Sequence, residues 1–192
     1  MQQMDKEHNK HTQKYYKGLS QREGVKFMET STYWEERGRL AYQYKHETFY
    51  TVTPIPYYYR RRNYLLELMA PYLEEVATGS ICDFGCGDGW YLNFFSRKLS
   101  HLPGKKWHGV DMSKSMIERA QSQCPGASLH VSATGIQFNT LFDLVYSIAV
   151  FAHIVDDASV IELFKNIASR TRTNGKFLLF EQTGPLRKQG ST

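Results

Sequence analysis

The chain has 192 residues and a mass of 22.3 kDa, which suits one folded domain. Its 41% hydrophobic and 22% charged residues exclude a wholly disordered chain and a fibrous repeat. A net charge of +5 suits an anionic partner, and we expect a solvated face or a site for an anionic small molecule rather than nucleic acid. No apolar run reaches the ~18 residues that span a bilayer, and the polar start is unlike a secretion signal. The three cysteines have no disulfide or zinc spacing, so we expect a cytoplasmic protein without a metal site.

The N-terminal third differs in composition from the rest of the chain. Eleven of the 13 tyrosines lie between residues 15 and 77. A breaker at Thr53–Pro56 precedes a helical stripe made of Tyr64, Leu65, Leu68, Met69 and Tyr72. We therefore expect a tail and aromatic-rich lid over 1–60, followed by the main domain over 61–192.

From residue 79 short apolar runs alternate with amphipathic segments. The pattern predicts helices at Trp90–Leu99, Ser113–Ser122 and Ala158–Thr171, and strands at Ser80–Phe84, Lys106–Val110, Ser128–Val131, Phe142–Ile148 and Lys176–Phe180. This β-α-β order predicts an α/β fold, a doubly wound, mostly parallel Rossmann-like sheet of about five strands. Ligands of such sheets bind beyond the carboxyl ends of the strands, where the strand order reverses.

A glycine-rich loop follows the first predicted strand. It reads Asp83-Phe84-Gly85-Cys86-Gly87-Asp88-Gly89, with a helix starting at Trp90. Glycine at every second position allows a tight turn and a close approach of a ligand to the main chain. Trp90 stands where a dinucleotide-binding loop has its last glycine, and no Gly-Lys-Ser/Thr follows, so neither a dinucleotide nor a phosphate loop is indicated.

Asp111 ends the second predicted strand, 22 residues after Gly89. A carboxylate at this place can accept both ribose hydroxyls of an adenosine. The structural alternatives are a tight turn for the glycine loop and a helix N-cap before Ser113 for Asp111. The glycine loop follows the first predicted strand and Asp111 ends the second, so both lie at the same edge of the predicted sheet. This arrangement favours a binding site over the structural alternatives.

These segments resemble the class I S-adenosylmethionine-dependent methyltransferases, whose first motif reads Asp-x-Gly-x-Gly-x-Gly. The resemblance covers about residues 60–182. It includes Asp111, the stretch Phe142–Ile154 and the Asn174–Phe180 turn into the fifth strand. It implies S-adenosylmethionine as the cofactor of the domain over 61–192.

The resemblance also implies roles for particular residues. Gly85 and Gly87, with Cys86 and Gly89 in the same loop, would approach the methionine part and the ribose, and Asp83 would lie near the methionine ammonium group. The remaining contacts would be Asp111 to the ribose hydroxyls, Met112 to the adenine, Ser132, Ala133 and Thr134 to the adenine amino side, and Ser147 and Ile148 to the methionine side.

Missing motifs narrow the class of acceptor. Amino-nucleobase enzymes carry Asn/Asp-Pro-Pro-aromatic where this chain reads Ser147-Ile148-Ala149-Val150, and no cysteine follows Cys124 to act on cytosine C5. The sequence after the fourth strand resembles that of the methyltransferases that act on small molecules. Phe180–Thr183 resembles the corresponding segment of enzymes from bacterial surface-glycan loci. We therefore expect methylation of a small molecule, at an oxygen of a sugar or other metabolite.

Two histidines are candidates for the general base that a hydroxyl acceptor needs. His153 follows the fourth strand at the mouth of the expected pocket, and His46 lies in the predicted lid. Histidine titrates near neutral pH, which suits this role. The alternative for His153 is a helix-start histidine that only packs or caps.

Two N-terminal clusters are candidates for ligand contacts. Tyr33-Trp34-Glu35-Glu36-Arg37 offers aromatic, acidic and guanidinium groups to the methionine end of the cofactor. Arg60, Arg61 and Arg62 would suit an anionic acceptor. For both clusters the alternative is an ordinary packing or solvated helix surface.

Related methyltransferases carry two more strands after the fifth, and nine residues follow Thr183 here. Nine extended residues span only about 30 Å, so we expect a fragment of a longer protein, or a sheet with an exposed fifth strand. Such an edge invites pairing with a second copy, hence a homodimer. Two hypotheses for the function of the chain remain open. It is either a small-molecule methyltransferase or a cofactor-binding module without catalysis. Nucleic-acid methylation is a third hypothesis, which no motif supports.

Overall fold

The computed structural model describes residues 32, 34–36, 38, 39, 55–76, 79–101, 104–154 and 156–181. At its centre is a five-stranded sheet in the order β3-β2-β1-β4-β5, in which all neighbouring strands are parallel. The strands are β1 (Ser80–Phe84), β2 (Lys106–Asp111), β3 (Ser128–Val131), β4 (Phe142–Ile148) and β5 (Thr171–Phe180). The predicted doubly wound fold is confirmed.

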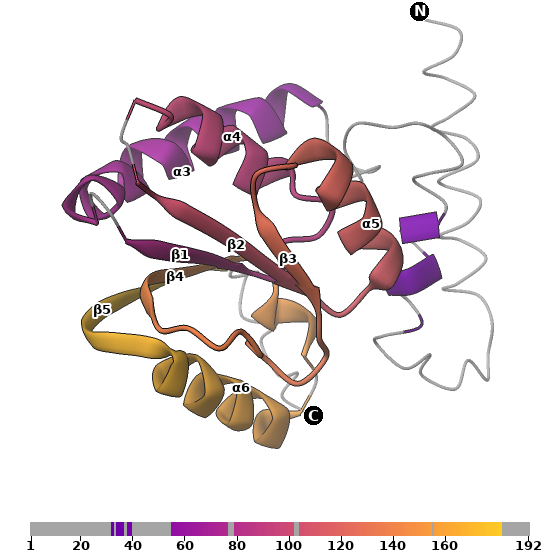
Figure 1. The fold of residues 1–192 in the computed structure, drawn as a ribbon. Coiled ribbons are helices and arrows are strands. Elements are labelled where there is room, and N and C mark those ends of the chain that lie inside the picture. The colour runs from indigo at the N-terminus through magenta and orange to yellow at the C-terminus, as the bar shows by residue number, and fades with distance from the viewer. Residues whose placement is uncertain are drawn as a thin grey trace, which may run out of the picture.

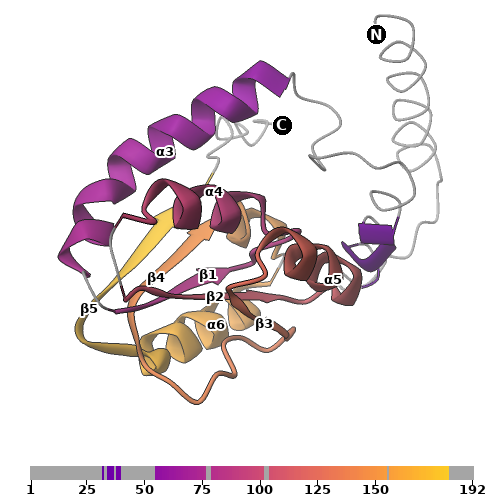
Figure 2. The same ribbon diagram turned by 45° about the horizontal axis from the view of Figure 1, so that its top comes forward.

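Helices cover both faces of this sheet. Figures 1 and 2 show α3 (Ile55–Glu75) and α4 (Trp90–Lys98) on one face and α6 (Asp157–Arg170) on the other. The helix α5 (Lys114–Gln123) packs beside β2 and β3, and a short 3-10 helix, η1 (Phe151–His153), follows β4. No helix in the described part of the chain is long and apolar enough to cross a membrane.

The core consists of two apolar layers that the central strands separate. Every residue of β1 is buried, and its side chains alternate between the layers. Ile81 belongs to the layer under α3 and α4, whereas Cys82 belongs to the layer over α6. In β4, Leu144 and Val145 divide in the same way. Burial on both faces holds the carboxyl ends of β1 and β4 in a fixed relation.

The apolar stripe of α3 differs from the predicted one. Leu65, Met69 and Leu73 face the core at four-residue spacing, whereas Tyr64 is 60% exposed and Leu68 41% exposed. The second proline of the predicted breaker belongs to the helix, because Pro56 lies in the first turn, where a missing N–H costs nothing. The helix therefore begins at Ile55 and runs through residue 60.

The fifth strand begins earlier than the sequence predicted. β5 starts at Thr171, directly after α6, instead of at Lys176. Asn174 has a φ of 65° and the pairing with β4 shifts register between Phe142 and Leu144, so Asn174 and Gly175 form an irregularity inside the strand. The other strand and helix bounds from residue 80 onward agree within one residue with the prediction.

Candidate cofactor site

A cavity of about 280 Å³ opens at the carboxyl ends of β1, β2 and β4. Phe84, Val110 and Ile148, at or next to the ends of these strands, all line it. The strand order reverses between β1 and β4, so the cavity lies at the switch point where doubly wound sheets bind ligands.

The glycine loop forms one wall of this cavity. Gly85, Gly87 and Gly89 all have positive φ, at 77°, 54° and 81°. A Cβ added to Gly85 would collide with the side chain of Val150, whereas one added to Gly87 would meet nothing within 4 Å. The backbone of Gly87 therefore faces open space in the cavity, and a ligand can approach it closely.

Asp111 holds the glycine loop from the end of β2. Its Oδ2 accepts a hydrogen bond from the Gly87 N–H at 2.9 Å, and its Oδ1 accepts one from the Ser113 N–H at 2.9 Å. The N-cap of α5 is Ser113, whose Oγ accepts from Met116 N–H, so the alternative of Asp111 as a helix cap is wrong. Burial raises the pKa of Asp111, and the two backbone N–H groups oppose that rise.

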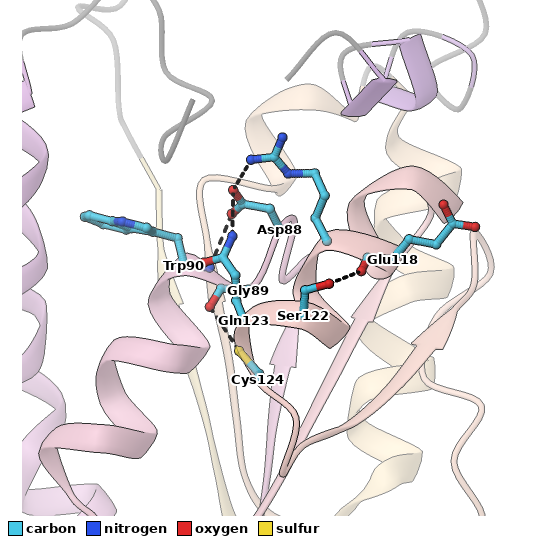
Figure 3. Close-up of polar contacts among 8 residues, drawn as sticks. Asp88, Gly89, Trp90, Glu118, Ser122, Gln123 and Cys124 are labelled. Carbon is cyan, nitrogen blue, oxygen red and sulfur yellow. Dashed lines mark hydrogen bonds and ion pairs between the residues drawn. The ribbon is translucent and has the colours of Figure 1, made fainter. Parts of the chain in front are cut away.

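Asp88 ties the other end of the loop to α5, as Figure 3 shows. Its carboxylate accepts hydrogen bonds from Trp90 N–H at 3.3 Å, from Arg119 at 3.4 Å and from Gln123 at 3.5 Å. Burial raises the pKa of Asp88, and the Arg119 charge counteracts the rise. This role of Asp88 was not predicted from the sequence. The sequence held one signal for this contact. Asp88 is an acid between two glycines, and Arg119 and Gln123 are four residues apart, so they lie on the same face of α5.

Asp83 is a deeply buried acid in the cavity wall, with 2% of its surface exposed. Within the described residues its Oδ2 accepts no hydrogen bond. Burial raises the pKa of Asp83 to about 8, the Asp111 charge adds to the rise, and the nearby Tyr146 hydroxyl opposes it. A buried carboxylate oxygen without a partner is costly, which is typical of a group that binds a ligand.

Trp34 and Glu35 contact two different parts of the chain near the cavity, the segment after β4 and the start of α5. Trp34 lines the cavity, and its ring contacts that of His153 edge-on at 4.9 Å. The Glu35 carboxylate accepts hydrogen bonds from Ser113 Oγ at 2.9 Å and Ser115 N–H at 3.1 Å. Glu35 thus binds the start of α5, so the Glu35 side chain is not the ligand contact that the sequence analysis expected. Tyr33 and Arg37 lie outside the described residues.

Arg62 packs behind the cavity wall. Its guanidinium lies 4.0 Å from the ring centre of Phe94, 4.5 Å from that of Tyr59 and 4.9 Å from that of Trp90. Burial lowers its pKa. Because Trp90 lines the cavity, this cation supports the wall from outside. None of the three arginines of the run lies in the described cavity wall, and Arg60 is exposed on the helix surface.

The structure places most of the predicted site residues around one cavity. Those in its wall are Asp83, Gly85, Cys86, Gly87, Asp111, Met112, Ser132, Ala133, Ile148 and His153. Gly89 instead begins α4, packed against Cys124 and Ala120, and Ser147 is fully buried in β4. His46 lies outside the described residues.

Several wall residues were missed by the sequence analysis. They come from the loop after β4 and from α6 and its N-cap, and include Ala149, Val150, Ile154, Asp156, Ser159 and Leu163. The pairing of β4 with β1 brings Ala149 and Val150 to the glycine loop, and α6 brings Ser159 and Leu163, so contacts between distant segments and not a local pattern place these residues.

Comparisons with known proteins agree with this geometry. Residues 81–175 match the family model described as a methyltransferase domain. Over 142 residues the chain is 28% identical to the tRNA (carboxymethyluridine(34)-5-O)-methyltransferase of Saccharomyces cerevisiae, which covers 72% of this chain and 47% of that protein. The chain thus spans about half the length of this curated relative.

Two crystal structures share the fold. The N-methyltransferase NodS of Bradyrhizobium japonicum, in complex with S-adenosylhomocysteine, superposes with a TM-score of 0.63 at 16% identity, over 79% of this chain and 72% of its own. The sugar N-methyltransferase KedS8 of Streptoalloteichus gives 0.54 at 17% identity, over 73% and 58%.

The parallel sheet with a glycine loop and an acid at its switch point is the fold of the class I S-adenosylmethionine-dependent methyltransferases. Residues 81–175 of this chain belong to the methyltransferase-domain family.

Proposed function

We propose that this chain binds S-adenosylmethionine in the cavity and transfers its methyl group to a small molecule, at an oxygen of a sugar or other metabolite. The observation that carries the proposal is the cradle formed by Gly87 and Asp111. The loop backbone faces the cavity there, with the carboxylate fixed beside it at 2.9 Å. The family match over residues 81–175 supports the same activity.

The residues present fit this cofactor. Gly85 and Gly87 would approach its methionine part and ribose, Asp111 would accept the ribose hydroxyls, and Met112 would pack on the adenine. Ser132 and Ala133 would lie on the adenine amino side and Ile148 on the methionine side. The orphaned Asp83 Oδ2 would receive the ammonium group. When bound, the cofactor supplies an electrophilic methyl group, and the chain orients the acceptor and excludes water.

The charge of the cavity wall narrows the acceptor. Its described residues include no lysine or arginine. Among its acids Asp83 and Asp111 would face the cofactor and Asp88 pairs with Arg119, which leaves Asp156 toward the acceptor. Such a wall favours cationic and neutral ligands and disfavours phosphates. It therefore supports a neutral or amine-bearing acceptor and argues against an anionic one.

The comparisons favour two kinds of acceptor. KedS8 is named as a sugar N-methyltransferase, which supports a sugar-like small molecule but at nitrogen. The yeast relative is named as a tRNA methyltransferase, so tRNA is a second candidate acceptor. RNA binding would require a basic surface for the phosphates, whereas the wall of this cavity is acidic.

Methyl transfer from deuterated S-adenosylmethionine, followed by mass spectrometry, tests the acceptor and the role of His153. We expect a labelled sugar product, and His153→Ala should slow transfer to a hydroxyl by about 10²–10⁴-fold because it removes the base. His101→Ala, which changes an exposed histidine in the turn after α4, is the matched control. An amine product with an unaffected rate would contradict both the oxygen acceptor and the base, and labelled tRNA would support the second candidate.

The raised pKa of Asp83 predicts that cofactor binding depends on pH. A raised pKa means that Asp83 is protonated in the folded protein below about pH 8, so its burial costs increasing stability as the pH rises from about 4 to 8, where only the unfolded chain releases the proton. A bound ammonium group favours the ionised form, so binding should release a proton, and affinity should rise by up to about tenfold per pH unit from pH 6 to 8. Calorimetry of S-adenosylhomocysteine in buffers of different ionisation enthalpy measures this release. Equal proton release by Asp83→Asn would contradict the assignment.

Several features of the chain stay proposals. We propose that the residues before 61 form a lid, with Trp34 as its contact to His153. The edge position of β5 supports pairing with a second copy.

The buried free thiols of Cys82, Cys86 and Cys124 support a reducing, cytoplasmic compartment.

A further inference from the structure

One carboxylate at the end of β5 binds three successive backbone N–H groups of the loop that follows β4. Glu181 Oε1 accepts from Val150 and Phe151 at 2.9 Å each, and Oε2 accepts from Ala152 at 3.2 Å. The next N–H back along the chain, that of Ala149, donates to the carbonyl of Phe180 at 2.8 Å. The end of β5 therefore binds four consecutive amides of this loop.

The loop needs such a partner because its own geometry is unfavourable. Ala149 has a φ of 57°, which is rare for a residue with a side chain. The amides that follow it begin η1, and the first N–H groups of a helix have no partner within the helix. The carboxylate satisfies these donors and places a negative charge at the positive end of the turn.

The loop joins the two halves of the proposed active site. Ala149, Val150, His153 and Ile154 all line the cavity. The Val150 side chain packs against Gly85 of the glycine loop, where an added Cβ would collide with it. His153 follows Ala152, whose amide is the last one bound to Glu181, and it ends η1. Its ring contacts that of Trp34.

Glu181 acts through this loop and not on a ligand. Its side chain is not part of the cavity wall, and both of its oxygens are engaged by the backbone. Nothing in the family match covers it, because the match ends at residue 175.

We propose that Glu181 is a positioning residue, which sets the loop 149–154 so that Val150 supports the cofactor loop and His153 faces the acceptor. The proposal rests on the proposed function for its consequence at the ligand, but its structural part can be tested without any ligand. Glu181→Ala removes the acceptor, and Glu181→Gln restores one acceptor oxygen for Val150 and Phe151.

Amide hydrogen exchange on the whole chain tests the structural part. In Glu181→Ala the amides of Val150, Phe151 and Ala152 should exchange about tenfold faster or more, since each loses its hydrogen bond. Glu181→Gln should restore protection at Val150 and Phe151 but not at Ala152, because the amide nitrogen of glutamine cannot accept. Exchange of the β4 amides should not change.

Calorimetric affinity for S-adenosylhomocysteine tests the functional part. We expect about tenfold weaker binding by Glu181→Ala and partial recovery in Glu181→Gln. Arg172→Ala is the matched control, because it breaks a contact to Asp143 at 3.2 Å at the other end of β5. It should lose stability without losing affinity.

Unchanged exchange in Glu181→Ala would overturn the proposal. Faster exchange with unchanged affinity would overturn it too, because the loop would then not shape the site. A parent protein that does not bind S-adenosylhomocysteine would overturn the proposed function, whereas faster exchange at the three amides would still support the positioning of the loop.

Discussion

The substitution Asp111→Ala is expected to weaken binding of S-adenosylhomocysteine by about 100-fold or more. Each hydrogen bond to a charged group contributes about 1.5–3 kcal/mol, and the carboxylate would accept two from the ribose. The alanine variant also releases the Gly87 N–H, which Asp111 holds at 2.9 Å. Equilibrium titration of parent and variant measures the loss.

Two further variants separate a binding role from a loss of folding. Asp111→Asn retains the shape and one acceptor oxygen and should bind with intermediate affinity. Asp143→Ala removes an aspartate from the same sheet at the amino end of β4, where it accepts from Ser80 N–H at 2.9 Å and pairs with Arg172. We expect Asp143→Ala to reduce stability without changing affinity, and equal losses in the two alanine variants would contradict a ribose-binding role for Asp111.

The substitution Gly85→Ala is expected to destabilise the fold by about 2–5 kcal/mol. A left-handed backbone with a side chain costs about 1–2 kcal/mol, and overpacking against Val150 adds about 1–3 kcal/mol. For a chain of this size the melting temperature should fall by roughly 10 °C. Thermal unfolding monitored by circular dichroism measures the shift.

Two other glycines are the matched controls. Gly126→Ala adds a methyl group in open space and should change stability by less than about 0.5 kcal/mol. Gly87→Ala has the backbone cost, with a φ of 54°, but no collision. It should therefore be destabilised less than Gly85→Ala, while its new side chain points into the ligand space and weakens binding. Equal stability of the Gly85 and Gly126 variants would contradict the described packing of the loop on Val150.

The parts of the fold that follow from local pattern could be predicted from the sequence. Buried strands such as Ser80–Phe84 read as apolar runs between amphipathic segments, and their order fixes a parallel sheet. The glycine loop and Asp111 carry local signals, and the topology then brings both to one end of the sheet. Trp34 was a candidate because it lies in a cluster of aromatic, acidic and basic residues, and the structure places its ring against that of His153.

The remaining site residues depend on contacts between distant segments. Glu181 lies about 30 residues from the amides that it binds, and Asp88 lies more than 30 residues from Arg119. No periodicity encodes such pairs. The early start of β5 was missed for a related reason: Asn174 and Gly175 are typical of a turn, but pairing with β4 incorporates them as an irregularity in the strand.

Calorimetric titration of the parent chain with S-adenosylhomocysteine tests whether the cavity binds the proposed cofactor. The cavity should take one ligand per chain, and we expect no binding of NAD, because Trp90 occupies the place of the last dinucleotide-loop glycine. A folded parent chain that gives no binding heat with S-adenosylhomocysteine in several buffers and temperatures, or that binds NAD more tightly, would contradict the account.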